Sequence, residues 1–173
     1  SFFAMQSHTL QGDTTRHSRT MDLMQQAGVK MIRDEMYWSN VEKEKGVIVI
    51  PDNYKQNVDI TLAHGIDVLV ILDYGNKFYD NGFSPNTPEG RAGFANYCYT
   101  IVSTFRGKIK YYEIWNEPNY AGFWKPKPNP SDYALLIQEA YNASKSADSE
   151  CVILGGVTSG VDIDYLDKVF AAG

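Results

Sequence analysis

An apolar segment that ends in Asn116, Glu117 and Pro118 carries the clearest chemistry in this sequence. Proline restricts the residue before it to extended backbone, so Glu117 is expected at the end of a strand with its carboxyl directed outward. Asn116 places a neutral amide beside that carboxyl, able to donate and to accept hydrogen bonds. This pair suits protonation of a glycosidic oxygen while a sugar hydroxyl is held. A turn with a merely solvated glutamate stays open from the motif alone.

The segments around this motif alternate between helical and strand patterns, each strand starting about forty residues after the last. Strands are predicted at residues 4–8, 29–33, 66–72, 109–115 and 151–154. Helices are predicted at residues 14–27, 54–64, 88–105, 133–147 (capped by Ser131) and from Asp162 or Asp164 to near Gly173. Such alternation is typical of an α/β fold with a parallel sheet covered by helices.

Two architectures fit this alternation, an eightfold barrel and an open doubly wound sheet. The segments that follow strands, such as residues 33–53 and 73–87, are long and rich in polar and aromatic residues. The returns from helix to strand at Gly28, Gly65 and Gly107 are short. Ligands are therefore expected at the carboxyl ends of the strands, as both architectures require.

The segment 115–119 (Trp-Asn-Glu-Pro-Asn), followed by Phe123 and Trp124, resembles the clan A glycoside hydrolases, and most of all family 39. Members of this clan are TIM barrels. The resemblance implies that Glu117 is the general acid/base of a retaining mechanism and that Asn116 binds the 2-hydroxyl of the sugar being cleaved. Residues 29–33 resemble the clan's second strand, where an arginine ends the strand and supports the catalytic carboxylates. Arg33 takes that place.

The chain length sets a limit on this resemblance. A (β/α)8 TIM barrel usually takes about 250 residues, whereas the sequence has 173. We therefore expect about the first five βα units of the barrel, forming a single domain over residues 1–173. The clan's nucleophile is a second glutamate on the seventh strand, and a retaining site needs two carboxyls about 5–5.5 Å apart. The nucleophile is expected beyond this chain.

Two other classes of function stay open. One is a non-catalytic carbohydrate-binding protein built on a partial barrel. The other is a doubly wound nucleotide-binding domain, although the sequence lacks the glycine fingerprint of dinucleotide sites. For the hydrolase, the partner is a carbohydrate substrate, no cofactor is implied, and open barrel edges favour self-association.

Several further residues are candidates for the sugar site or for its support. Glu113 is expected to pair with Arg33, because a charge in a buried strand needs a partner. His8, at the end of the first predicted strand, is expected either to line the sugar site or to be a structural histidine.

The chain holds 12 Tyr, 8 Phe and 3 Trp, which suits a large core or a cleft lined by rings. Trp38 and Trp124 are predicted as stacking platforms, with coverage of the core as the alternative. Asp73, Tyr74 and Asn76 follow the third predicted strand, so we expect them to contact substrate.

Composition excludes other classes. A net charge of -5 without a basic block argues against nucleic acid, and no apolar run reaches the roughly 20 residues that cross a bilayer. Cys98 and Cys151 are too few for a disulfide scaffold and are expected to be buried free thiols. The histidine spacing predicts no metal site. We expect that a signal peptide is absent or already removed, and a secreted or periplasmic location is favoured because sugar polymers usually lie outside cells.

Overall fold

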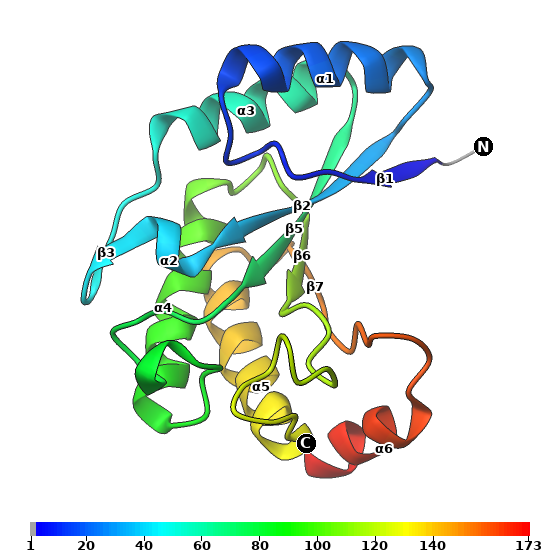
Figure 1. The fold of residues 1–173 in the computed structure, drawn as a ribbon. Coiled ribbons are helices and arrows are strands. Elements are labelled where there is room, and N and C mark those ends of the chain that lie inside the picture. The colour runs from blue at the N-terminus through cyan, green and yellow to red at the C-terminus, as the bar shows by residue number, and fades with distance from the viewer. Residues whose placement is uncertain (1–2) are drawn as a thin grey trace.

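The computed structural model, which describes residues 3–173, contains a parallel sheet of five strands. The strands lie side by side in chain order (Figure 1). They are β1 (Ala4–Gln6), β2 (Met31–Tyr37), β5 (Asp67–Asp73), β6 (Tyr111–Ile114) and β7 (Val152–Leu154). Each neighbouring pair is parallel.

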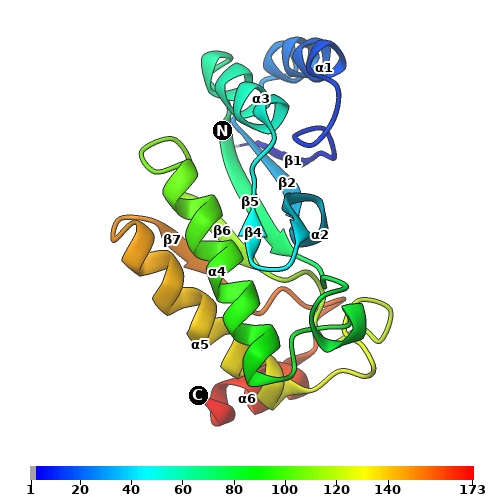
Figure 2. The same cartoon turned by 90° about the vertical axis from the view of Figure 1, so that its left-hand side faces the viewer.

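A helix follows each strand of the sheet. These helices are α1 (Thr14–Gln26), α3 (Asp52–Ala63), α4 (Pro88–Thr104), α5 (Pro130–Ala147) and α6 (Ile163–Ala172). Helices α1 and α3 lie next to each other, as do α4 and α5 (Figures 1 and 2). A doubly wound sheet reverses its strand order at a switch point, and this sheet has no reversal. The expectation of a barrel-type fold with five βα units is confirmed, and the doubly wound alternative is wrong.

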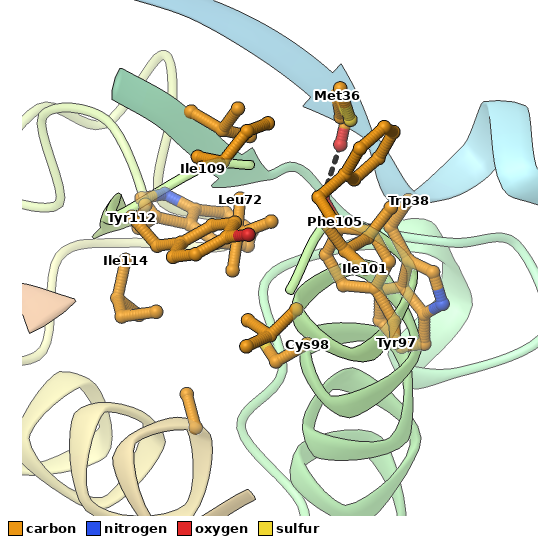
Figure 3. Packing of buried hydrophobic residues seen from close by; sticks show 14 of the residues in the cluster. Met36, Trp38, Leu72, Tyr97, Cys98, Ile101, Phe105, Ile109, Tyr112 and Ile114 are labelled. Carbon is orange, nitrogen blue, oxygen red and sulfur yellow. Dashed lines mark hydrogen bonds between the residues drawn. The ribbon is translucent and has the colours of Figure 1, made fainter. Parts of the chain in front are cut away.

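The core lies between the sheet and the helices. Figure 3 shows Met36, Leu72 and Ile114 from three strands packed near Tyr97 and Cys98 of α4. The hydroxyl of Tyr97 donates a hydrogen bond to the carbonyl oxygen of Met36, so its polar atom is satisfied inside the core. The strand residues in this layer alternate with residues that face the opposite side of the sheet.

Local sequence explains how the longer helices begin and end. The side chain of Thr87 caps α4 and Pro88 follows at the first helical position. Gly28, Gly65 and Gly107 have left-handed backbone where helix returns to strand, which a residue without Cβ adopts most easily. Helix α5 is capped by Asn129 and not by Ser131 as predicted, because Pro130 extends the helix toward the N-terminus.

The stretch after Arg33 departs from the prediction. Strand β2 continues to Tyr37, four residues beyond the predicted end, because it pairs with β5 along its whole length, from Met31 opposite Asp67 to Tyr37 opposite Asp73. The segment predicted as a loop also contains the short helix α2 (Trp38–Val41) and an antiparallel hairpin of β3 (Glu42–Glu44) and β4 (Val47–Ile48). A 3-10 turn, η1 (Asp80–Gly82), lies in the β5–α4 loop.

Both cysteines are buried and unbridged, as expected, and burial raises the pKa of each thiol. Within residues 3–173, no three His, Cys, Asp or Glu side chains gather as metal ligands. No helix in this part of the chain has the length and apolar character to cross a bilayer.

Candidate active site

The face of the sheet turned away from the helices carries a row of polar side chains. On β2, Arg33, Glu35 and Tyr37 alternate with Ile32 and Met36, which enter the core, and with Asp34, a buried carboxylate that accepts hydrogen bonds from the segment after β1. On β6, Glu113 lies between the core residues Tyr112 and Ile114, so it shares the face of Arg33. The period of two along each strand therefore concentrates charge on one surface.

Arg33 joins three of the strands. Its Nε lies 2.9 Å from Glu113 Oε2 and its Nη2 lies 2.5 Å from Glu113 Oε1. Nη1 donates to Gln6 Oε1 at 2.5 Å, and Nη2 also donates to Asn116 Oδ1 at 2.9 Å. The bidentate pair is the strongest form of ion pair that arginine makes, and the glutamate raises the pKa of Arg33 although burial opposes it. The predicted pairing of Glu113 with Arg33 is confirmed.

The amide of Asn116 is held from both ends. Its Oδ1 accepts from Arg33, and its Nδ2 donates to the hydroxyl of Tyr74 at 3.1 Å. A side-chain amide offers two donor hydrogens and two acceptor lone pairs. One of each therefore stays free, in a known orientation, to bind a hydroxyl group of a ligand.

Glu117 lies three residues beyond the end of β6 and has left-handed backbone, with φ of +50°. The prediction that Pro118 holds it extended is wrong. Its N–H donates to the carbonyl of Val157 at 3.1 Å, and its carbonyl accepts from Tyr120 N–H at 3.0 Å, so these two bonds fix the turn. The half-buried carboxylate has no hydrogen-bond or ion-pair partner among residues 3–173.

His8 lies on the same face, at the β1 end. Its Nδ1 is 2.9 Å from Glu35 Oε2, which also accepts from the hydroxyl of Tyr37 at 2.8 Å. The ring of Tyr37 stacks on Tyr74, with centroids 5.9 Å apart. His8 is largely exposed while Glu35 is buried, so the histidine is held by a carboxylate yet open to a ligand.

The two predicted tryptophan platforms are buried, and the prediction that they stack on sugar is wrong. Trp38 stacks on Tyr79, with centroids 4.8 Å apart, and its Nε1 donates to Glu42. Trp124 packs edge-on against Trp115 at 5.2 Å. Both rings have lost their solvent contact, which agrees with the alternative that they cover the core.

Asn76 is also buried, and it organises the loop after β5 instead of facing a ligand. Its Nδ2 donates to the carbonyl of Glu42 at 3.0 Å and its Oδ1 accepts from Phe78 N–H at 3.1 Å. The expectation of substrate contact is wrong for Asn76. Of the residues after β5, only Tyr74 joins the cluster around Asn116.

Sequence reasoning missed Gln6, Glu35 and Tyr37. The signal was present, because polar side chains recur at every second position from Arg33 onward. The prediction that the strand ends at Arg33 removed Glu35 and Tyr37 from consideration.

Asp73, the last residue of β5, is an unusual group on this face. It is fully buried, and neither carboxyl oxygen has a partner among the described residues. Burial raises the pKa of Asp73 well above its usual value, and the nearby charges of Glu35 and Glu113 add to the rise, while Arg33 opposes it. The neutral acid is therefore favoured in the folded protein, and direct contact with substrate is excluded by its burial.

The model of one protein family, cellulase (glycosyl hydrolase family 5), matches residues 1–168. The chain belongs to this family. The clan-level resemblance is thereby confirmed. No curated protein sequence matches the chain.

Solved structures of glycoside hydrolases share the fold of this family 5 chain. A family 39 hydrolase from the gut symbiont Bacteroides cellulosilyticus WH2 is 30% identical, with a TM-score of 0.77 over 89% of this chain and 31% of its own. GH5_18 from Streptomyces cattleya, solved with GlcNAc, is 17% identical, with a TM-score of 0.73 over 91% and 44%. Endoglucanase Cel5A from Thermotoga maritima is 19% identical, with a TM-score of 0.66 over 87% and 47%. The chain thus spans less than half the length of each of these structures.

The state of Asp73 predicts how stability depends on pH. Because the folded-state pKa is raised, the stability that Asp73 contributes is complete below the unfolded pKa of about 3.9 and is lost as pH rises through the folded value. Asp73→Asn removes this loss. Urea unfolding from about pH 4 to about pH 8 should therefore show a steeper fall for the wild type than for Asp73→Asn.

Asp67→Asn is the matched control, since Asp67 is an exposed carboxyl at the other end of β5. This variant should keep the wild-type dependence on pH. Parallel pH profiles for the wild type and Asp73→Asn would contradict the assignment of a buried neutral acid.

Proposed function

We propose that this chain supplies the acid/base half of a retaining glycoside hydrolase that cleaves O-glycosidic bonds. Glu117 acts as general acid/base and Asn116 holds the 2-hydroxyl of the sugar. The observation that carries the proposal is the contrast between the side chains of Asn116 and Glu117, which are adjacent in the sequence. The amide of Asn116 is fixed by Arg33 and Tyr74, while the Glu117 carboxylate beside it is free of protein partners in the described chain.

The proposed reaction has two steps. In the first, Glu117 gives its proton to the leaving oxygen as a carboxylate attacks the anomeric carbon and forms a glycosyl-enzyme. In the second, Glu117 takes a proton from a water molecule, which attacks the same carbon and releases the sugar. General acid and base assistance of this kind typically contributes about 10²- to 10⁴-fold.

We infer that the attacking carboxylate is a glutamate beyond Gly173. On the polar face of the sheet, Glu113 is engaged by both nitrogens of the Arg33 fork. Glu35 accepts from His8 and Tyr37, and Asp73 is buried. None of these three is free to attack a sugar, which supports a nucleophile supplied by another part of the protein.

Carbohydrate binding without catalysis is the second candidate function. It shares Asn116, Tyr74 and His8 with the hydrolase, and it differs only in making no use of proton transfer by Glu117. The left-handed backbone at Glu117 favours the hydrolase, because strained non-glycine residues cluster at active sites.

The acid/base role predicts a dependence on the leaving group. In the full-length protein, Glu117→Ala should lower turnover by about 10²- to 10⁴-fold for substrates with poor leaving groups. Aryl glycosides with good leaving groups need little protonation and should lose far less in the first step. Added azide should restore turnover by attacking the glycosyl-enzyme. Steady-state rates on a series of aryl glycosides measure all three effects.

Glu150→Ala is the control, because Glu150 is exposed and lies just before β7, at the amino ends of the strands, whereas Glu117 lies beyond their carboxyl ends. It should leave turnover unchanged for every leaving group. Equal losses in Glu117→Ala on good and poor leaving groups, without rescue by azide, would remove Glu117 from the acid/base role.

We also propose that the 173-residue chain made alone self-associates. Strands β1 and β7 form the outer edges of the sheet, and unpaired edges recruit other chains. Leu154, on β7, is 37% exposed. Light scattering should give a mass above that of the monomer, and Leu154→Lys should lower it by placing a charge at the edge.

Leu23→Lys is the matched control, since Leu23 is 66% exposed on α1 and not on a strand edge. It should leave the measured mass unchanged. A chain that is monomeric without substitution would contradict the proposal.

A further inference from the structure

A cavity of about 270 Å³ lies between the loop after β5 and the loop after β6. The two loops are joined where Lys125 N–H donates to Ser84 Oγ at 3.0 Å. Gly75 lines the cavity, and a Cβ at this position would lie only 2.4 Å from the carbonyl oxygen of Phe83. The walls are thus built by close backbone contact. Ligand pockets for drug-sized molecules typically measure about 300–1,000 Å³, so this cavity suits a single sugar ring.

Aromatic rings form the apolar part of the cavity. Tyr74 and Phe123 stack with centroids 5.5 Å apart and planes 7° from parallel, while Phe83 and Trp115 complete the lining. Phe83 is 42% exposed and Phe123 is 37% exposed. Aromatic faces bind apolar surfaces of ligands, and the C–H face of a pyranose is such a surface. Trp115 is itself buried, as Trp38 and Trp124 are, so Phe83 and Phe123 are the lining rings with exposed surface for a ligand.

Lys125 gives the cavity its charge. It carries the only charged side chain among the lining residues. It is exposed, and it forms no ion pair with any acid in residues 3–173, whereas Lys45 and Lys108 both pair with acids on the surface. A lysine ammonium acts as a point charge for anionic groups. The cavity therefore combines a stacking surface with an unpaired positive charge.

The cavity adjoins the candidate active site through two of its lining residues. The hydroxyl of Tyr74 accepts from Asn116, and Trp115 directly precedes that asparagine. We propose that this cavity binds an anionic pyranose, a sugar unit that bears a carboxylate or a sulfate, with Lys125 contacting the anionic group and Phe123 the ring. The idea that this anionic sugar is part of a cleaved substrate rests on the proposed function, whereas the binding of the sugar to the cavity does not.

An NMR titration of the full-length protein tests the site with three probes: D-glucuronate, D-glucose 6-sulfate and neutral D-glucose. At least one anionic sugar should bind more tightly than glucose, and added salt should weaken that binding. Lys125→Ala should weaken it by about tenfold or more, the usual effect of losing a charged hydrogen bond. The comparison of glucuronate with the sulfate ester identifies which anion is preferred.

Lys127→Ala is the matched control, because Lys127 is an exposed lysine two residues away that does not line the cavity. It should bind both anionic sugars as the wild type does. Phe123→Ala should weaken binding of the same anionic sugar by removing the stacking ring. The proposal is overturned if glucose binds as tightly as the anionic sugars, if none of the probes binds, or if Lys125→Ala has no more effect than Lys127→Ala.

Glu117→Gln separates this site from the proposed reaction. Anionic sugars should still bind to this variant, since Glu117 does not line the cavity. If Glu117→Gln abolishes turnover but no anionic sugar binds the wild type, the cavity proposal fails and the hydrolase stands. If binding depends on Lys125 while Glu117→Gln keeps full turnover, the hydrolase fails and the cavity stands.

Discussion

The ion pair between Arg33 and Glu113 is the interaction on which the candidate site depends. The guanidinium links β2 to β6 through Glu113 and to β1 through Gln6, and it donates to the amide of Asn116. Removing one partner of a buried pair typically costs about 3–5 kcal/mol because it leaves an unpaired charge; the partial exposure of Arg33 places this pair at or below the lower end. The same contact that holds the strands together thus decides which way Asn116 faces.

The conformation of the backbone after β6 determines where the Glu117 carboxylate lies. Trp115 and Glu117 both have left-handed backbone, which typically costs about 1–3 kcal/mol at each non-glycine residue. The turn persists because the Glu117 N–H donates to the carbonyl of Val157, in the loop after β7. Two neighbouring βα units are therefore needed to place one carboxylate, and within residues 3–173 that carboxylate has no hydrogen-bond or ion-pair partner.

Much of the fold follows from the sequence, because the spacing of apolar residues indicates helices and strands, and Gly28, Gly65 and Gly107 mark where a helix ends before the next strand. The pairing of Glu113 with Arg33 could also be predicted, since a buried charge requires a partner. The backbone of Glu117 could not, because it is set by a bond to a residue forty positions away. Nor could burial of Trp38 be distinguished from exposure, because aromatic content does not tell which ring faces a cavity and which faces the core.

The central claim is that Glu113, through Arg33, orients Asn116 toward the sugar 2-hydroxyl. The most direct measurement compares kcat/KM of the full-length wild type and Glu113→Gln on paired substrates that carry or lack that hydroxyl. The account predicts that Glu113→Gln loses about tenfold or more on the substrate with the 2-hydroxyl and much less on its 2-deoxy partner, since only the first uses the oriented amide. An equal loss on both substrates would reduce the pair to a structural contact and contradict the account.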